Sequence, residues 1–207
     1  ARENGLAIAA YAQTAHALGD ATALAIAKGA ALRMIATHLP TKVPLPGAFT
    51  HGPADGPPEG TRHLADNAAM GWGLLHLDAI TRGTPDEDPR YLEAAKGVAR
   101  LLVEDLEDQA DGGFFAHTKD LGAVGVFATR RKPFDQNALA VRFLAKLHAR
   151  APDPRFPRSI QRALTLLIVP DAIREQGRFV GELLSALDET RELLPPLFDC
   201  ARRGIAH

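Results

Sequence analysis

Apolar residues recur along this chain at intervals of three and four, the spacing that places them on one face of an α-helix. Such series begin near residues 8, 24, 64, 91, 140, 160 and 179. Stretches rich in proline and glycine interrupt them at 40–61 and 107–133, where a helix cannot continue. The pattern predicts an all-α protein of consecutive helices with two long non-helical connections.

One sequence pattern recurs at the start of alternate helices. Residues 20–31 (DATALAIAKGAA) share six positions with residues 88–99 (DPRYLEAAKGVA), and residues 153–156 (DPRF) echo the beginning of the second copy. The leading aspartate of each copy can cap the free N–H groups of a helix start. Each copy follows another helix after a few residues, which predicts antiparallel helix pairs. We therefore expect a single helical domain over residues 1–207, with hairpins at about 4–39, 63–106 and 136–168 and a final helix at about 179–194.

Both long connections follow the second helix of a pair, so both fall at the same end of the helix layer. Within the second, DGGFF at 111–115 and GVFAT at 125–129 are short apolar runs next to glycine, a pattern typical of a hairpin. We expect a short β-ribbon near residues 112–130. Long connections in a compact domain are often functional, so a site is expected at this end of the layer.

Composition excludes several classes of function. Lys+Arg 24 against Asp+Glu 25 leaves a net charge of -1, so no basic field favours nucleic acid or an anionic membrane. No apolar stretch approaches the roughly 18 residues of a spanning helix, so membrane insertion is not expected, and no secretory signal is visible. The compartment stays open. Cys200 is the only cysteine, which excludes an intrachain disulfide and a cysteine-cluster metal site. No metal and no cofactor are predicted, because no ligand-spaced motif or nucleotide-binding loop is present.

Four short motifs follow one another in the order of a known family. They are Asn4-Gly5-Leu6, LADNA at 64–68, DGGFF at 111–115 and RKPFDQN at 131–137. They resemble the WNGL, LDDYA, DGGFF and RPKxxYDGxxPSGNS segments of the YyaL-like family, thioredoxin-domain proteins related to the spermatogenesis-associated group. The helical portion of that family is a C-terminal (α/α)6 toroid of the six-hairpin glycosidase superfamily, similar to N-acylglucosamine 2-epimerases. The resemblance spans about residues 4–190.

The chain departs from the family pattern in ways that bear on function. Glu3 stands where the family has tryptophan, and the Asp-Tyr and Pro-Ser-Gly elements are missing. The thioredoxin domain is absent, and three hairpins are about half of a six-hairpin ring. The missing residues fall where a pocket would be lined, which favours a site that has lost its catalytic function.

The resemblance implies a set of candidate residues. Enzymes of this fold use carboxylates or histidines at the loop-bearing end of the cavity. Glycoside hydrolysis needs a carboxylic acid of raised pKa with a second carboxylate, and epimerisation needs paired bases. The candidate acids and bases are Asp66, Asp111, Asp135, His63 and His117. The candidate substrate contacts are Trp72 and Phe115, as stacking surfaces, with Arg131 and Asn137.

Each candidate also has a structural explanation. Asp66 and Asp135 lie at helix starts, where a carboxylate caps N–H groups, and Asp111 precedes two glycines of a turn. Trp72 lies at core spacing. Two functions therefore stay open. The first is a non-catalytic toroid-type scaffold or binding subunit, whose partner is another protein or the remainder of the toroid. The alternative is a carbohydrate-active enzyme, a sugar epimerase or glycoside hydrolase.

Overall fold

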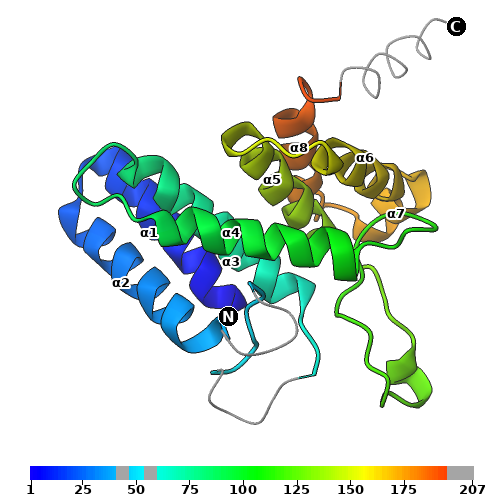
Figure 1. Ribbon diagram of the computed structural model, residues 1–207. Coiled ribbons are helices and arrows are strands. Elements are labelled where there is room, and N and C mark those ends of the chain that lie inside the picture. The colour runs from blue at the N-terminus through cyan, green and yellow to red at the C-terminus, as the bar shows by residue number, and fades with distance from the viewer. Residues whose placement is uncertain (41–46, 54–59, 195–207) are drawn as a thin grey trace, which may run out of the picture.

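The computed structural model describes residues 1–40, 47–53 and 60–194. Regular structure in these residues is helical, as the apolar spacing predicted, and the fold class is confirmed (Figure 1). The elements are α1 (Arg2–Leu18), α2 (Ala21–His38), α3 (Leu64–Thr81), α4 (Pro89–Leu101), the π-helical turn η1 (Leu102–Leu106), the 3₁₀ turn η2 (Gly125–Ala128), α5 (Phe134–Arg150), α6 (Arg155–Leu167), α7 (Pro170–Gln176) and α8 (Gly181–Thr190). None of the described helices is long and apolar enough to cross a membrane.

The repeated aspartates perform the same local function in all three copies. Each accepts a hydrogen bond from the backbone N–H two residues further on, over 2.8 Å for Asp20, 3.0 Å for Asp88 and 2.8 Å for Asp153. This satisfies a donor that the first helical turn leaves without a partner. Gly19 adopts the left-handed conformation at the end of α1 (φ 65°) and lets the chain reverse into α2.

The helices form two layers. In one layer α1 contacts α3, α3 contacts α5, and α8 follows on the other side of α5. In the other layer α2, α4 and α6 each pack against the first helix of their own hairpin (Figure 1). The three helices α1, α3 and α5 begin at the same end of the molecule, and residues from their first turns therefore line one pocket.

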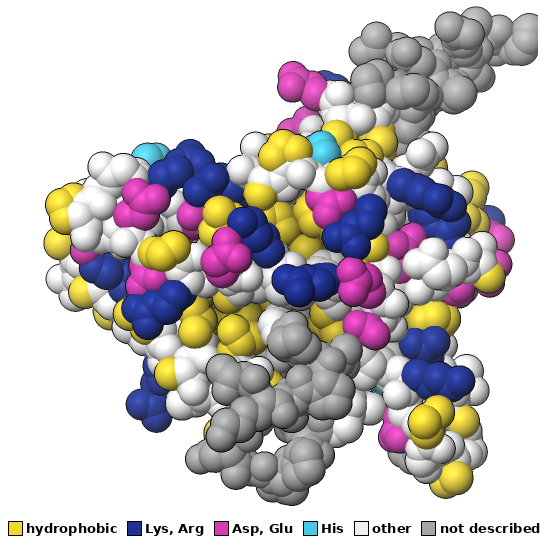
Figure 2. Space-filling view, viewed as in Figure 1, with side chains coloured by type: hydrophobic (Ala, Val, Ile, Leu, Met, Phe, Trp, Pro, Cys, Tyr) yellow, Lys and Arg dark blue, Asp and Glu magenta, His cyan; other side chains and the backbone are white. Residues whose placement is uncertain are grey.

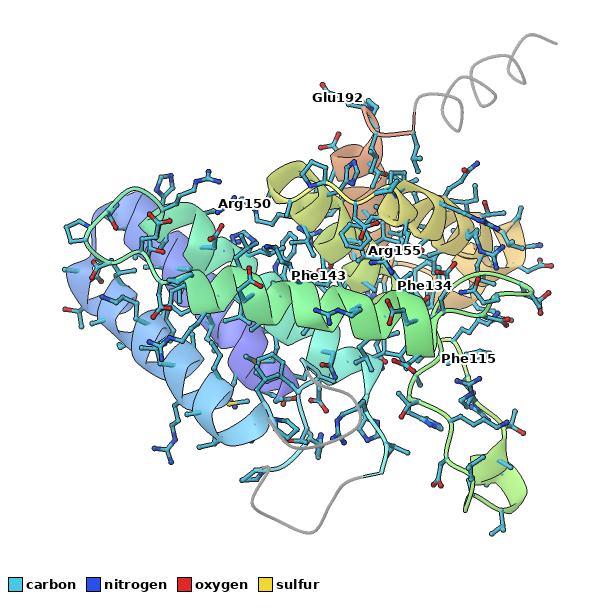
Figure 3. All side chains as sticks on the ribbon, viewed as in Figure 1. Phe115, Phe134, Phe143, Arg150, Arg155 and Glu192 are labelled. Carbon is cyan, nitrogen blue, oxygen red and sulfur yellow. The ribbon has the colours of Figure 1, made fainter. Side chains whose placement is uncertain are left out.

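Small residues bring the helices of the first layer close together. A Cβ atom added to Gly5 would collide with the backbone of Ala69 and Met70 in α3. The ring of Phe143 in α5, labelled in Figure 3, fills the space that a side chain at Gly71 would need. The glycine of the Asn4-Gly5-Leu6 motif is therefore a packing requirement of the α1–α3 contact.

The prediction of a short β-ribbon near residues 112–130 is wrong. In the described part of the chain, Phe114 pairs with Glu107 and His117 pairs with His63, each through a single isolated bridge, and residues 125–128 form the turn η2. A ribbon would need successive backbone groups to face a second strand. Here the backbone N–H and C=O of Phe114 bond to the Asn137 side chain instead.

The loop that contains η2 projects from the helices. Leu121, Val124 and Val126 at its tip are 88%, 77% and 81% exposed. Apolar side chains are visible on this projection at the lower right of Figure 2. With no apolar surface to cover these side chains, the loop lacks the buried face that stabilises a β-hairpin.

Candidate functional site

A pocket of about 310 Å³ opens at the N-terminal ends of α1, α3 and α5. This is the end of the layer that carries both long connections. Its volume is at the lower limit of small-molecule sites, which span roughly 300–1,000 Å³. The lining residues are Arg2, Glu3, His51, His63, Ala65, Asp66, Ala116 and Gln136.

Two asparagines hold the long connections over these helix starts. The Asn67 side chain accepts from the N–H of Phe49 (2.8 Å) and donates to its C=O (3.1 Å). Asn137 binds Phe114 in the same way, over 2.6 and 2.9 Å. Each asparagine also donates to the carbonyl four residues before it. We call these two arrangements the asparagine clamps. They position the backbone segments that carry His51 and His117.

Asp66 is the most constrained group of the pocket. The residue is 2% exposed, and its carboxylate accepts a hydrogen bond from the backbone N–H of Arg2 at 2.8 Å and lies 2.9 Å from Nδ1 of His51. The nitrogen of Ala1 is 3.2 Å away. Asp66 therefore caps the neighbouring helix α1. Burial raises the pKa of Asp66, whereas the hydrogen bonds from His51 and from the backbone N–H of Arg2 lower it, and the pKa lies below its usual value.

An ionised Asp66 determines the proton position on His51. A carboxylate only accepts hydrogen bonds, so Nδ1 of His51 carries the hydrogen in this contact. In the neutral imidazole, Nε2 is then the basic nitrogen. The His51 side chain is 69% exposed, which leaves it accessible from solvent. This histidine–aspartate pair is an arrangement that can accept and return a proton.

Three imidazoles lie in a row at this end of the molecule. The ring centroids of His51 and His63 are 5.8 Å apart, and those of His63 and His117 are 6.2 Å apart, both edge to face. The backbone bridge between His63 and His117 fixes the second pair. His117 lines a separate hollow of about 390 Å³, beside Arg130, at the base of the projecting loop.

The three predicted carboxylates do not converge. Only Asp66 lines the pocket. Asp111 is exposed in its glycine turn, where its N–H is 3.4 Å from the Asp108 carboxylate. Asp135 is 60% exposed at the start of α5, and its nearest cation is Arg2 at 3.9 Å. A hydrolase site that needs two of these carboxylates is therefore not assembled.

The predicted substrate contacts also lie outside this pocket. Trp72 is 8% exposed, and its ring is covered by the edge of His76 and by the Arg142 guanidinium, both at 4.5 Å. Arg130 covers the Phe115 ring at 3.8 Å. Arg131 is exposed, and its backbone carbonyl accepts from Ala116 over 2.7 Å.

Asn137 has a structural role, since it is fully buried and its amide is occupied by the second asparagine clamp. Six of the residues lining the pocket were not predicted as site residues, and four of these have polar side chains, namely Arg2, Glu3, His51 and Gln136. Glu3 and Gln136 precede Asn4 and Asn137, just as Asp66 precedes Asn67. That recurrence is the sequence signal that could have identified Glu3 and Gln136. No group of three or more metal-ligand side chains converges among the described residues.

No family model and no curated protein matches this sequence. Solved structures match it in fold. Cellobiose 2-epimerase from Spirochaeta thermophila superposes with a TM-score of 0.62 at 16% identity, over 79% of this chain and 41% of that one. D-Mannose isomerase superposes with a TM-score of 0.60 at 15% identity, over 80% of this chain and 42% of that one. The third structure is an inactive α-1,6-mannanase variant from Salegentibacter in complex with α-1,6-mannotriose. It superposes with a TM-score of 0.61 at 15% identity, over 79% of this chain and 45% of that one.

The fold is that of an α/α toroid. At 15–16% identity these matches show the fold alone, and the six-hairpin glycosidase superfamily expected from the sequence motifs stays a prediction. The chain spans less than half the length of each of these solved structures.

Proposed function

We propose that this chain contributes a carbohydrate site to a toroid protein, in which His51 moves a proton on a bound sugar. The observation that carries this proposal is the His51–Asp66 contact of 2.9 Å inside the pocket, with a second imidazole, that of His63, in edge contact. The toroid neighbours, named as epimerase, isomerase and mannanase, support a sugar as the ligand.

Proton transfer fits this pocket better than glycoside hydrolysis does. A hydrolase needs a carboxylic acid that stays protonated near neutral pH. The pKa of Asp66 is lowered, so this buried carboxyl cannot serve as that acid. Imidazole, in general, is the side-chain group that both accepts and donates protons near neutral pH.

The spacing of the two imidazoles favours isomerisation over epimerisation. Bases that flank a sugar ring from opposite faces must be about 7 Å or more apart, because each needs a contact of about 3.5 Å with the ring. The His51 and His63 centroids are 5.8 Å apart, too close for a ring to lie between them. A single base that moves a proton between adjacent carbons on one face, while the hydroxyl proton passes from O2 to O1, requires no such gap.

Solvent hydrogen exchange tests this proposal directly. The chain is incubated with D-mannose in D₂O, and proton NMR follows loss of the hydrogen on the carbon next to the carbonyl. We expect exchange above the buffer rate, reduced about 100-fold or more in His51→Gln and in Asp66→Asn. His16→Gln is the matched control, since His16 is exposed at the far end of α1. Exchange that survives in His51→Gln would overturn the assigned base.

A binding role without turnover is the second proposal. The chain spans 41–45% of the three solved structures named above, so further hairpins are needed to enclose a deep cavity. These hairpins could come from another protein, which is the scaffold or binding-subunit function. The YyaL-like resemblance also remains a prediction. Saturation-transfer NMR with D-mannose distinguishes the two roles: a ligand signal without exchange supports binding alone.

A further inference from the structure

A second pocket, of about 190 Å³, lies between the C-terminal ends of α3 and α5. It is separate from the pocket that His51, His63 and Asp66 line. From Asp66 to Asp78 the helix α3 rises about 18 Å, at about 1.5 Å per residue. The lining residues are Leu75, Asp78, Ala79, Arg82, Lys146, Ala149 and Arg150.

The charges of this pocket do not balance. It contains three cationic side chains, Arg82, Lys146 and Arg150, and one carboxylate, Asp78. Asp78 is bound to Nε of Arg150 at 2.8 Å, a contact from α5 to α3 (Arg150 is labelled in Figure 3). Among the described residues, neither Arg82 nor Lys146 forms an ion pair within 4 Å. Two positive charges therefore remain without a counter-charge in direct contact.

Lys146 is the group that most needs an anion. It is half-buried, and the Trp72 ring lies 5.4 Å from its nitrogen. Burial lowers the pKa of Lys146; the longer-range attraction of Glu189 opposes that effect, and the nearby Arg142 adds to it. The Glu189 carboxylate is itself bound to Arg142 at 2.8 Å. A partly buried cation without a carboxylate in direct contact is costly, and an anion in the pocket would offset that cost.

Cations near helix C-termini have an ordinary explanation, because they complement the helix dipole. That explanation accounts for Arg82 and Arg150, which lie at the ends of α3 and α5. It does not account for Lys146, which lies one turn earlier, half-buried in the wall of a hollow. The concave shape and the excess charge together indicate a ligand.

We propose that this pocket binds a phosphate dianion, either free or as the phosphate group of a small ligand. The excess of two positive charges matches the charge of the dianion. Guanidinium groups present paired N–H donors that suit phosphate oxygens, and lysine adds a point charge. Leu75, Ala79 and Ala149 supply the apolar part of the wall.

Calorimetric titration with inorganic phosphate at pH 8 tests this site, with chloride used to hold ionic strength constant. We expect saturable binding to the chain, and a loss of affinity of about tenfold or more in Lys146→Met and in Arg82→Gln. Arg158→Gln, at an exposed position on α6, is the matched control and should bind as the unsubstituted chain does. Circular dichroism checks that each variant remains helical. Because Arg82 is exposed, Arg82→Gln should leave the fold intact.

Three outcomes would overturn the proposal. One is the absence of saturable phosphate binding to the unsubstituted chain. Another is an equal loss in Arg158→Gln, which would indicate a general electrostatic effect. The third is acetate binding as tightly as phosphate, which would contradict the match to a doubly charged ligand. None of these outcomes bears on proton exchange at His51, so the two proposals fail independently.

Discussion

Replacing Asn137 by alanine removes all three hydrogen bonds of the second asparagine clamp. Phe114 is fully buried, and both of its backbone groups lose their partner in this variant. A buried polar group without a partner costs about 1–3 kcal/mol. Two such groups predict a loss of about 2–6 kcal/mol in the free energy of unfolding. Because the stability of a whole domain is only about 5–15 kcal/mol, this loss is large.

Urea unfolding followed by far-UV circular dichroism measures this loss. Asn67→Ala should show a similar loss, since its clamp on Phe49 has the same geometry. Asn4→Ala is the control. Asn4 lies at the corresponding place in α1, is exposed, and makes no such clamp in the described part of the chain. It should change stability by less than about 0.5 kcal/mol. If Asn137→Ala costs no more than Asn4→Ala, the clamps do not hold the loops.

Two further predictions concern packing and titration. Gly5→Ala should destabilise the chain by several kcal/mol, because the added Cβ would meet the α3 backbone. The control is Gly29→Ala, whose added Cβ meets nothing within 4 Å and which should stabilise the chain by about 0.5–1 kcal/mol. Unfolding curves of the two variants with equal midpoints would contradict this reading. NMR should find His76 titrating at about 4, because burial and then the charges of Lys146 and Arg142 lower its pKa. Lys146→Met should raise that pKa, and an unchanged value would show that Lys146 does not act on the ring.

The fold was predictable because its signals are local. Helical spacing and the capping aspartates act within a few residues, so the sequence displays them directly. The short helix α7 was missed, since its seven residues contain no fully buried side chain and therefore no apolar period. The expected ribbon failed for the opposite reason. Phe114 has high β-propensity, but the partner of its backbone is a side chain 23 residues away.

The sequence predicts at which end of the helices the candidate site lies, but only some of the residues that line it. Asp66 at a helix start indicated a cap, yet the helix that it caps is α1, whose first turn lies 64 residues earlier. His51 lies in a proline-rich connection without periodicity, and only the fold brings it to Asp66. The sequence offers Trp72 for stacking or for the core; the side chain lies in the core, and the Arg142 guanidinium of a neighbouring helix covers its ring.

The asparagine clamps show why one hairpin cannot make this site. The first long connection supplies His51, and the clamp from Asn67 in the second hairpin holds it. The second connection supplies Ala116, and the clamp from Asn137 in the third hairpin holds it. Each wall of the pocket thus depends on the hairpin that follows it. Asn4 repeats the clamp position at the start of α1, so the recurring asparagine, and not the scattered aspartates, marks where this architecture builds its pocket.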